Sequence, residues 1–136
     1  MTDTTTEKPG ISAAIIVQDG KVLMVRRAVK EGKLSWQFPA GAIEPGEGAE
    51  DAAVRETLEE TALTVKAVRL LGERIHPNTG RLMSYTAATV VEGDARVADA
   101  EELDAVAWVA HSEITDYVPY PLYEKVQEYL DEVLPH

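Results

Sequence analysis

The chain contains no cysteine, so none of its 136 residues can form a disulfide bond. This absence is compatible with a reducing cytoplasm, where we expect the protein to act. No apolar run reaches membrane-spanning length, and the polar start of the chain lacks the apolar core of a signal peptide. We therefore expect residues 1–9 to form a disordered tail and residues 10–136 to form a single domain.

Basic residues are also scarce: 13 Lys and Arg stand against 24 Asp and Glu, which gives a formal net charge of −11. Such a charge argues against a nucleic-acid polymer or an anionic membrane surface as a partner. A small anionic ligand remains compatible with it, because a bound metal and a few basic side chains can neutralise that ligand locally. Hydrophobic residues make up 45% of the chain, as expected for a globular domain with a real core.

The spacing of apolar and turn-forming residues predicts several strands and two helices. Asp19-Gly20 is typical of a two-residue hairpin turn. The expected strands are 11–17, 21–27, 64–71, 82–91 and 105–109; the expected helices are 49–62 and 121–134; a loop is expected at 31–35 and a short extended piece at 36–39. Because strands and helices do not alternate regularly, we expect an α/β fold with a mixed sheet packed between helices.

The first predicted helix carries an unusual stripe of acidic residues. Glu56, Glu59 and Glu60 lie at positions i, i+3 and i+4, and therefore share one face of the helix. A solvated acidic face is the common explanation of such a pattern. The alternative is a site for a hard divalent cation such as Mg²⁺ or Mn²⁺, because carboxylate oxygens are the ligands these ions prefer.

The surroundings of the stripe favour the metal site. The same stripe includes small apolar residues that favour close packing, and a loop rich in Gly and Pro precedes the helix. Val54 and Leu58 lie on the opposite face, so we expect this helix to be apolar on that side too and to be packed between two layers.

The segment from Gly41 to Leu63 resembles the signature of the Nudix hydrolase family. That signature has Gly, five residues, Glu, seven residues, Arg-Glu, an aliphatic residue, any residue, Glu-Glu, any residue, Gly and an aliphatic residue. The matching positions here are Gly41, Glu47, Arg55, Glu56, Glu59, Glu60 and Leu63. Two positions depart from the pattern: Thr57 replaces an aliphatic residue and Ala62 replaces the glycine. We interpret both as local variation in packing and in the end of the helix.

The resemblance implies a fold and an activity. The implied fold is the Nudix-type α/β/α sandwich, with a mixed β-sheet between helices. The implied activity is Mg²⁺-dependent hydrolysis of a nucleoside diphosphate linked to another group, with Mn²⁺ as a possible substitute. Family members are often dimers, so a homodimer is possible.

The resemblance also implies roles for individual residues. By the family pattern, Glu59 and Glu60 are metal ligands together with the backbone carbonyl of Ala40, and Glu56 is either a ligand or the base that takes the proton of the attacking water. Arg55 is expected to orient a carboxylate, and Glu47 is its expected partner.

A further acid and the groups that bind substrate lie outside the signature. Glu102, six residues before Trp108, is the preferred extra acid, with Glu101 and Asp104 as alternatives. The preferred basic residue is Arg27 rather than Arg26, since strand alternation sends these two side chains to opposite faces. The weaker candidates are Arg81 and His76 for contacts with the ligand, and Trp36, Phe38, Tyr85 and Tyr120 for base stacking, among which Tyr85 is preferred.

Within this class, the first choice of substrate is an oxidised or non-standard nucleoside triphosphate, cleaved to the monophosphate and pyrophosphate in a MutT-like reaction. The basis of this choice is the short chain, in which no added recognition domain is apparent. Hydrolysis of ADP-ribose, of another nucleotide sugar or of a dinucleoside polyphosphate is the alternative. A binding module that senses a nucleotide without turnover is the alternative of another class, although a sensor has no chemical need for the complete set of acids.

Overall fold

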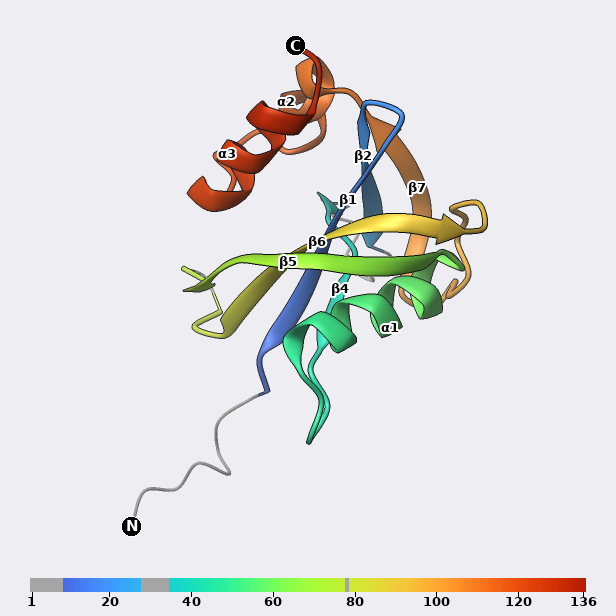
Figure 1. Cartoon of the computed structure of the whole chain (residues 1–136), viewed down its shortest axis with the longest axis vertical. Coiled ribbons are helices and arrows are strands. Elements are labelled where there is room, and N and C mark those ends of the chain that lie inside the picture. The colour runs from blue at the N-terminus through green and yellow to red at the C-terminus, as the bar shows by residue number, and fades with distance from the viewer. Residues whose placement is uncertain (1–8, 28–34, 78) are drawn as a thin grey trace.

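A mixed β-sheet lies between helices that cover its two faces (Figure 1). The computed structural model describes residues 9–27, 35–77 and 79–136. Its elements, in chain order, are β1 (Ile11–Gln18), β2 (Lys21–Arg27), β3 (Ser35–Gln37), β4 (Ala40–Ala42), α1 (Ala49–Thr61), β5 (Thr64–Ile75), β6 (Leu82–Glu92), β7 (Leu103–Val109), the 3₁₀ turn η2 (His111–Glu113), α2 (Ile114–Tyr117) and α3 (Glu124–Val133). The fold class predicted from the sequence is confirmed.

The strand order is β3-β2-β1-β6-β5, with β4 paired to β1 and β7 paired to β2. Strands β1 and β6 run parallel, and the other pairs are antiparallel. Strand β1 therefore lies at the centre of the sheet and brings β4 close to α1. Among the described residues, no helix combines the length and the apolar character needed to cross a bilayer.

Several predicted elements differ from the structure at their ends. The strand expected at 64–71 continues to Ile75, because its backbone stays paired to β6 through three register shifts. The last helix begins at Glu124 instead of residue 121, since the backbone of Tyr123, with φ of −54° and ψ of 133°, is not helical. The predicted tail at residues 1–8 and residues 31–34 of the predicted loop lie outside the described residues, and Ser35 already belongs to β3.

Two hydrophobic clusters fill the space on either side of the sheet, and the alternation of side chains in β1 builds both. Ala13 and Ile15 belong to the cluster under α2 and α3, whereas Ala14 and Ile16 belong to the cluster that also contains Ala53 of α1. Ile15 and Ile16 are fully buried, and burial of such a side chain contributes roughly 1.5–3 kcal/mol. A sheet covered on both faces explains why β1 is an almost continuous apolar run.

The predicted hairpin turn between β1 and β2 is present. Asp19 and Gly20 both adopt left-handed backbone, with φ of 52° and 77°. Two consecutive residues of positive φ match the twist of the flanking strands, and this requirement favours Asp-Gly at these positions.

The face of helix α1 that contacts the sheet carries small residues. Ala52, Ala53 and Thr57 are buried against the sheet, and the Thr57 hydroxyl donates to the carbonyl of Ala53 at 2.8 Å, so the polar group is satisfied inside the core. The expectation that Leu58 anchors the opposite face was wrong, because its side chain is 50% exposed. Val54, the other apolar residue expected on that side, is partly buried against the cluster that contains Ala53.

Helix α1 ends at Thr61, and the next residue, Ala62, adopts left-handed backbone with φ of 64° and donates its N–H to the carbonyl of Leu58 at 3.0 Å. This is the position where the Nudix signature has glycine. An alanine in this conformation brings its Cβ close to the next carbonyl, at a cost of about 1 kcal/mol.

We expect Ala62→Gly to raise the free energy of unfolding by about 0.5–1 kcal/mol, because glycine adopts the left-handed conformation without this penalty. Denaturant unfolding measures the change. Ala98→Gly is the matched control: Ala98 is exposed and is absent from the residues with positive φ, so this substitution should lower stability. A decrease of equal size in both variants would contradict the prediction.

Candidate functional site

The guanidinium of Arg55 organises the acidic face of α1. Its Nε and Nη2 donate to the two carboxylate oxygens of Glu47 at 2.8 and 2.9 Å, and Nη2 also donates to the carbonyl of Ala42 at 3.0 Å. Its Nη1 lies 3.1 Å from Glu56 Oε2 and 3.2 Å from Glu59 Oε1. One cation thus connects the loop before the helix, strand β4 and two acids of the stripe.

The predicted pair between Arg55 and Glu47 is present as a bidentate ion pair. This contact and the N–H of Glu44 hold the pKa of Glu47 well below its usual value, at about 2. Glu47 is therefore ionised at every physiological pH. It fixes the loop between β4 and α1 at a constant distance from the helix.

Glu56 lies directly against the backbone of Gly41. A Cβ placed on Gly41 would collide with the carboxylate of Glu56, so only glycine allows this close approach. Partial burial is the largest cause that raises the pKa of Glu56, and Arg55 opposes it. Gly41 is thus needed because the carboxylate of Glu56, 15 residues later, occupies the space that a side chain at position 41 would fill.

Glu60 is the buried member of the stripe, with 3% of the residue exposed. Among the described residues its Oε1 has no hydrogen-bond partner, while the backbone of Ala40 donates to the same carboxylate. Burial and the nearby charge of Glu56 raise the pKa of Glu60 to about 8. A buried carboxylate that lacks a partner is costly, and here a second carboxylate adds to the cost.

Two groups from other elements approach the stripe. Arg27, at the end of β2, lowers the pKa of Glu60 through its charge, and its Nη2 lies 3.2 Å from Glu102 Oε1. The negative charge of Glu102 in turn raises the pKa of both Glu56 and Glu60. These effects place the charges of Arg27 and Glu102 within electrostatic range of the carboxylates of α1.

Backbone contacts explain how Glu102 reaches this place. After β6 the chain crosses the end of α1, where Ala98 N–H donates to the carbonyl of Glu60 at 2.9 Å and Arg96 N–H donates to that of Thr61 at 3.0 Å. Glu102 then precedes β7, which pairs with β2. Arg26 has different surroundings: it pairs with Asp104 at 2.7 Å, and its guanidinium lies over the ring of Trp36.

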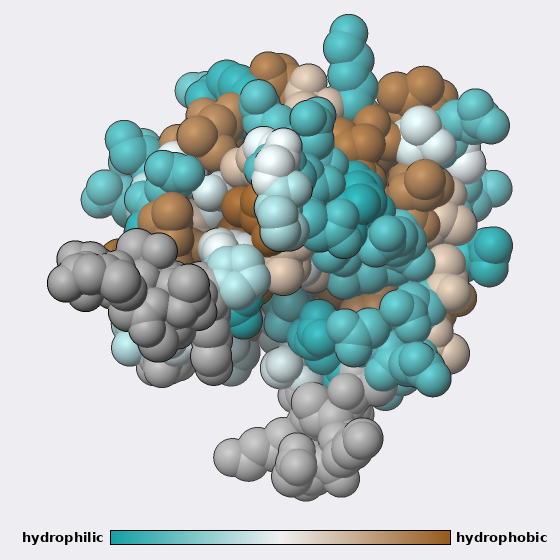
Figure 2. Space-filling model, turned by 90° about the horizontal axis from the view of Figure 1, so that it is seen from below, coloured by the Kyte–Doolittle hydropathy of each residue, from teal (hydrophilic) through white to brown (hydrophobic). Residues whose placement is uncertain are grey.

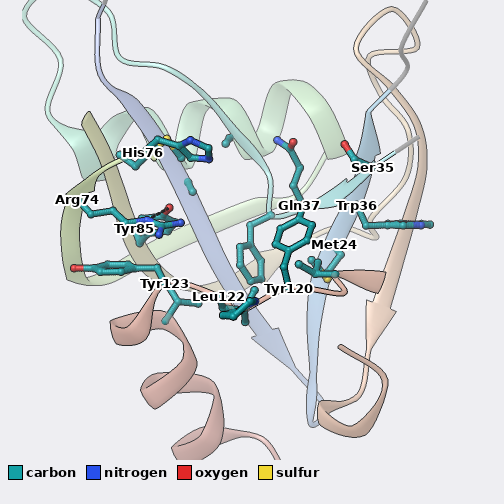
Figure 3. Close-up of a pocket in the computed structure, with 17 residues that line it drawn as sticks. Met24, Ser35, Trp36, Gln37, Arg74, His76, Tyr85, Tyr120, Leu122 and Tyr123 are labelled. Carbon is teal, nitrogen blue, oxygen red and sulfur yellow. Dashed lines mark hydrogen bonds between the residues drawn. The ribbon is translucent and has the colours of Figure 1, made fainter. Parts of the chain in front are cut away.

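A pocket of about 190 Å³ lies between the sheet and the segment that connects α2 to α3 (Figure 3). Its wall includes Ala40, which also contacts Glu60, so the pocket adjoins the acidic stripe. Tyr85 is in the wall but only 5% exposed; its ring lies 5.0 Å from that of Tyr123, and Arg74 Nε donates to its hydroxyl at 3.3 Å. The other residues labelled in the view are Met24, Ser35, Trp36, Gln37, His76, Tyr120 and Leu122.

Arg81 is not brought to this region. Its guanidinium donates to the carbonyl of Pro9 at 2.8 and 3.2 Å, and it is not part of the pocket wall. His76 does line the pocket, and its Nδ1 accepts from the N–H of Thr79 at 3.3 Å. The geometry therefore gives no support to Arg81 as a substrate contact.

Sequence reasoning did not find Arg74 or Tyr123 as parts of the pocket. Arg74 lies over the rings of both Tyr85 and Tyr123, at 5.9 and 5.2 Å from their centroids. The strand prediction ended before Arg74, which removed it from consideration. Strand alternation could have found it. Met83 and Tyr85 face the same side of β6, and Arg74 pairs with Met83, so Arg74 lies on the side of Tyr85.

The acidic stripe fits a divalent metal ion. Every available donor is a carboxylate or carbonyl oxygen, the ligand type of Mg²⁺ and Mn²⁺. Within the described parts of the chain, the buried Oε1 of Glu60 has no hydrogen-bond partner, and a cation would supply one. Glu59 stays accessible, with 55% of its side chain exposed, and hydrophilic residues gather at the centre of the face seen from below (Figure 2).

Without a metal, Glu60 should make the stability of the fold depend on pH. Its pKa is about 8 in the folded protein against an ordinary 4.5, so the folded state binds this proton more tightly than the unfolded chain. The resulting stabilisation is fully present below pH 4.5 and is lost as the pH rises through 8. In the presence of a chelator, we expect Tm to fall by roughly 10 °C more between pH 5 and pH 8.5 in the wild type than in Glu60→Gln. Parallel Tm profiles of the two proteins would contradict this.

Comparisons with known proteins agree with the geometry. RNA pyrophosphohydrolase from Serratia proteamaculans is 47% identical over 64 residues, which are 47% of this chain and 35% of that protein. The corresponding enzyme of Escherichia coli strain K12 is 45% identical over the same length. The match thus spans only about a third of the curated relatives' length.

Solved structures extend the likeness to almost the whole chain. A NUDIX hydrolase from Nitrosomonas europaea covers 92% of this chain and 88% of its own, with a TM-score of 0.74 and 28% identity. A further crystal structure of a NUDIX hydrolase from that organism, at 24% identity and a TM-score of 0.78 over 92% of this chain and 71% of that chain, shares the fold. The family model of the NUDIX domain matches residues 7–133. The chain therefore belongs to the Nudix family.

Proposed function

We propose that this protein is a divalent-metal-dependent pyrophosphohydrolase that cleaves a phosphoanhydride bond in a nucleoside diphosphate-linked substrate. The observation that carries this proposal is the buried carboxylate of Glu60, one oxygen of which has no partner among the described residues, beside Glu56 and Glu59 on one helix face. Family membership supports the same reaction class.

The metal would be held by Glu56, Glu59 and Glu60, with the backbone carbonyl of Ala40 as a further ligand. Mg²⁺ is the proposed ion, and Mn²⁺ its substitute, because the donor set consists of oxygen only. When bound, the ion supplies positive charge against the phosphate oxygens and lowers the pKa of a bound water.

The side chains of this protein have separate tasks in the proposed reaction. Arg55 holds Glu56 and Glu59 in place while Glu47 holds Arg55, so the acids cannot move apart under their mutual repulsion. Glu56 or Glu102 accepts the proton of the attacking water, and both lie where their charges influence Glu60. Arg27 binds a phosphate oxygen of the substrate, and in doing so it gives up its partly exposed ion pair with Glu102.

The pocket is the proposed site of the nucleoside. It is lined by aromatic rings and adjoins the stripe through Ala40, so a base placed in it would direct its phosphates toward α1. We propose a nucleoside triphosphate, oxidised or non-standard, as the substrate. ADP-ribose, other nucleotide sugars and dinucleoside polyphosphates are the alternatives of the same class.

The 5′-triphosphate end of an RNA is a second candidate substrate. The observation in its favour is the identity of 45–47% with enzymes named RNA pyrophosphohydrolase. The formal net charge of −11 opposes extended contacts with an RNA backbone. This candidate therefore requires that only the terminal nucleotides contact the protein.

A substrate panel with product identification tests the proposal. The panel contains nucleoside triphosphates, oxidised nucleoside triphosphates, ADP-ribose, a dinucleoside polyphosphate and a short RNA with a 5′-triphosphate, each with Mg²⁺. Release of pyrophosphate and a monophosphate from the free nucleotides supports the first choice, and preference for the RNA supports the second. Nucleotide binding without turnover on the whole panel would support a sensor and overturn the enzyme proposal.

We expect Glu60→Gln to lower kcat by about two orders of magnitude or more, because it removes a ligand of the metal ion. The charge of that ion stabilises the transition state by several kcal/mol. The shape of the residue is nearly unchanged, so circular dichroism and Tm at low pH should stay near wild type. Glu50→Gln is the matched control, since Glu50 is an exposed acid in the first turn of the same helix. Full activity of Glu60→Gln would count directly against the metal role.

The two neighbouring arginines of β2 offer a second matched pair. We expect Arg27→Gln to raise KM about tenfold, because it removes one charge-assisted contact to a phosphate. Arg26→Gln should change KM much less, since Arg26 pairs with Asp104 and lies over Trp36. Steady-state kinetics on the best substrate measures both, and a larger effect of Arg26 would refute the assignment of Arg27.

A further inference from the structure

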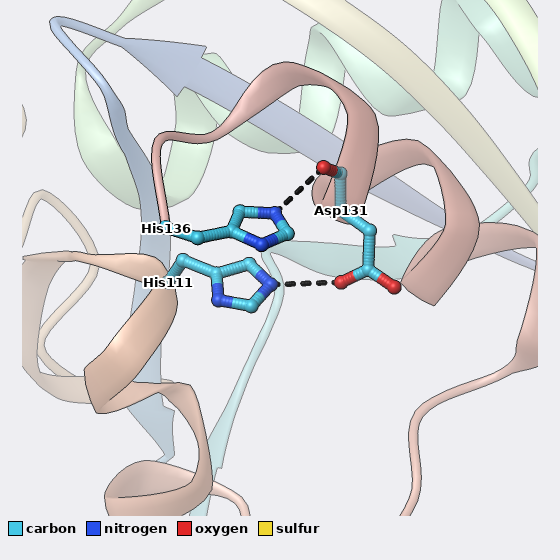
Figure 4. Close-up of side chains that lie close together, drawn as sticks. All are labelled: His111, Asp131 and His136. Carbon is cyan, nitrogen blue, oxygen red and sulfur yellow. Dashed lines mark hydrogen bonds and ion pairs between the residues drawn. The ribbon is translucent and has the colours of Figure 1, made fainter.

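A cluster of two histidines and one aspartate lies where η2 meets the end of α3 (Figure 4). His111 Nε2 is 2.7 Å from Asp131 Oδ1, and His136 Nε2 is 2.7 Å from the backbone carbonyl of Asp131. The two imidazole rings are stacked, with centroids 3.9 Å apart and planes at 14°. The potential ligand atoms of the three residues all lie within 4.8 Å of one another.

Each of the three residues follows a buried anchor, so the backbone of the cluster is fixed. His111 comes two residues after the fully buried Val109, and Asp131 comes directly after the fully buried Leu130. His136 comes two residues after the buried Leu134, whose N–H donates to the carbonyl of Leu130 at 3.0 Å. Three separate segments therefore converge through packing in the core.

The carboxylate of Asp131 is also oriented by a neighbour. Gln127, one helical turn earlier on α3, donates its Nε2 to Asp131 Oδ1 at 2.8 Å. Hydrogen bonds of this kind set the orientation of carboxylates that bind metals. The side chains of His111 and Asp131 keep 23% and 47% of their surface exposed, so an ion can enter from solvent.

We propose that His111, Asp131 and His136 form a second cation site, specific for a borderline divalent transition metal such as Zn²⁺. Two imidazole nitrogens with one carboxylate oxygen are the donors that Zn²⁺ uses at about 2.0–2.2 Å, with a further position left for water. Ligand atoms around such an ion stand about 3.3 Å apart. Binding the ion would turn the two stacked imidazole rings so that one nitrogen of each faces it, and His136 and Asp131 are exposed enough for this change.

This site differs from the acidic stripe in chemistry and in place. The stripe of α1 offers oxygen atoms alone, which suit Mg²⁺, whereas imidazole selects Zn²⁺ and its neighbours in the transition series. Glu102 precedes the first residue of β7 and His111 follows its last, so the length of β7, roughly 20 Å, separates the two regions. The ion would join η2 to α3 and to the segment after α3, and so stabilise the fold.

Calorimetric titration of metal-stripped protein with ZnCl₂, in excess MgCl₂ to occupy the stripe, tests the proposal. We expect one Zn²⁺ to bind to the wild type and to raise Tm by about 5 °C at saturation. His136→Gln, which lies beyond α3 and threatens no packed element, should weaken this binding about tenfold or more. His76→Gln is the matched control, because His76 lies outside the cluster and should leave the titration unchanged.

Two results would overturn the proposal. One is a wild-type protein that takes up no Zn²⁺ in the presence of Mg²⁺, in which case the cluster is only an ion pair that ties η2 to α3. The other is equal Zn²⁺ binding in the wild type, His136→Gln and His111→Gln. Neither result bears on phosphoanhydride hydrolysis, so this site and the proposed function fail independently.

Discussion

The rest of this structure depends on one buried carboxylate, that of Glu60, whose Oε1 has no hydrogen-bond partner among the described residues. Glu60 is held inside the molecule at the end of a helix that also presents Glu56 and Glu59 on the same face. Burial and repulsion both oppose its ionisation, and Arg27 and the Ala40 backbone offset only part of this cost. A cation bound at this face would offset the remaining cost of ionising Glu60.

The surrounding architecture keeps these acids together. Arg55 neutralises part of the charge and fastens the helix to the loop through Glu47 and to β4 through the carbonyl of Ala42. Gly41 leaves room for Glu56. The pairing of β4 with β1 fixes the position of Gly41 in the sheet, and therefore where Glu56 can lie. The two hydrophobic clusters then make this arrangement rigid, since β1 is packed on both faces.

The sequence predicted those parts of the fold that follow from local spacing. Hydrophobic periodicity indicated the central strands and both long helices, and the acid spacing indicated a shared face on α1. The exposure of Leu58 could not be predicted, because helix periodicity says which residues share a face and not whether a second layer covers it. The contact of Arg81 with Pro9 was also hidden, since it joins residues 72 positions apart. The pocket likewise depends on tertiary packing between β6, β3 and the segment before α3.

The most direct test of the central claim is a titration with Mn²⁺ at pH 8, followed by the electron paramagnetic resonance signal of the free ion. The account predicts that the wild type removes Mn²⁺ from solution and that the affinity of Glu60→Gln for Mn²⁺ is lower by about tenfold or more. Equal binding by the two proteins would show that the buried carboxylate does not hold the metal, and the account of the acidic helix would then be wrong.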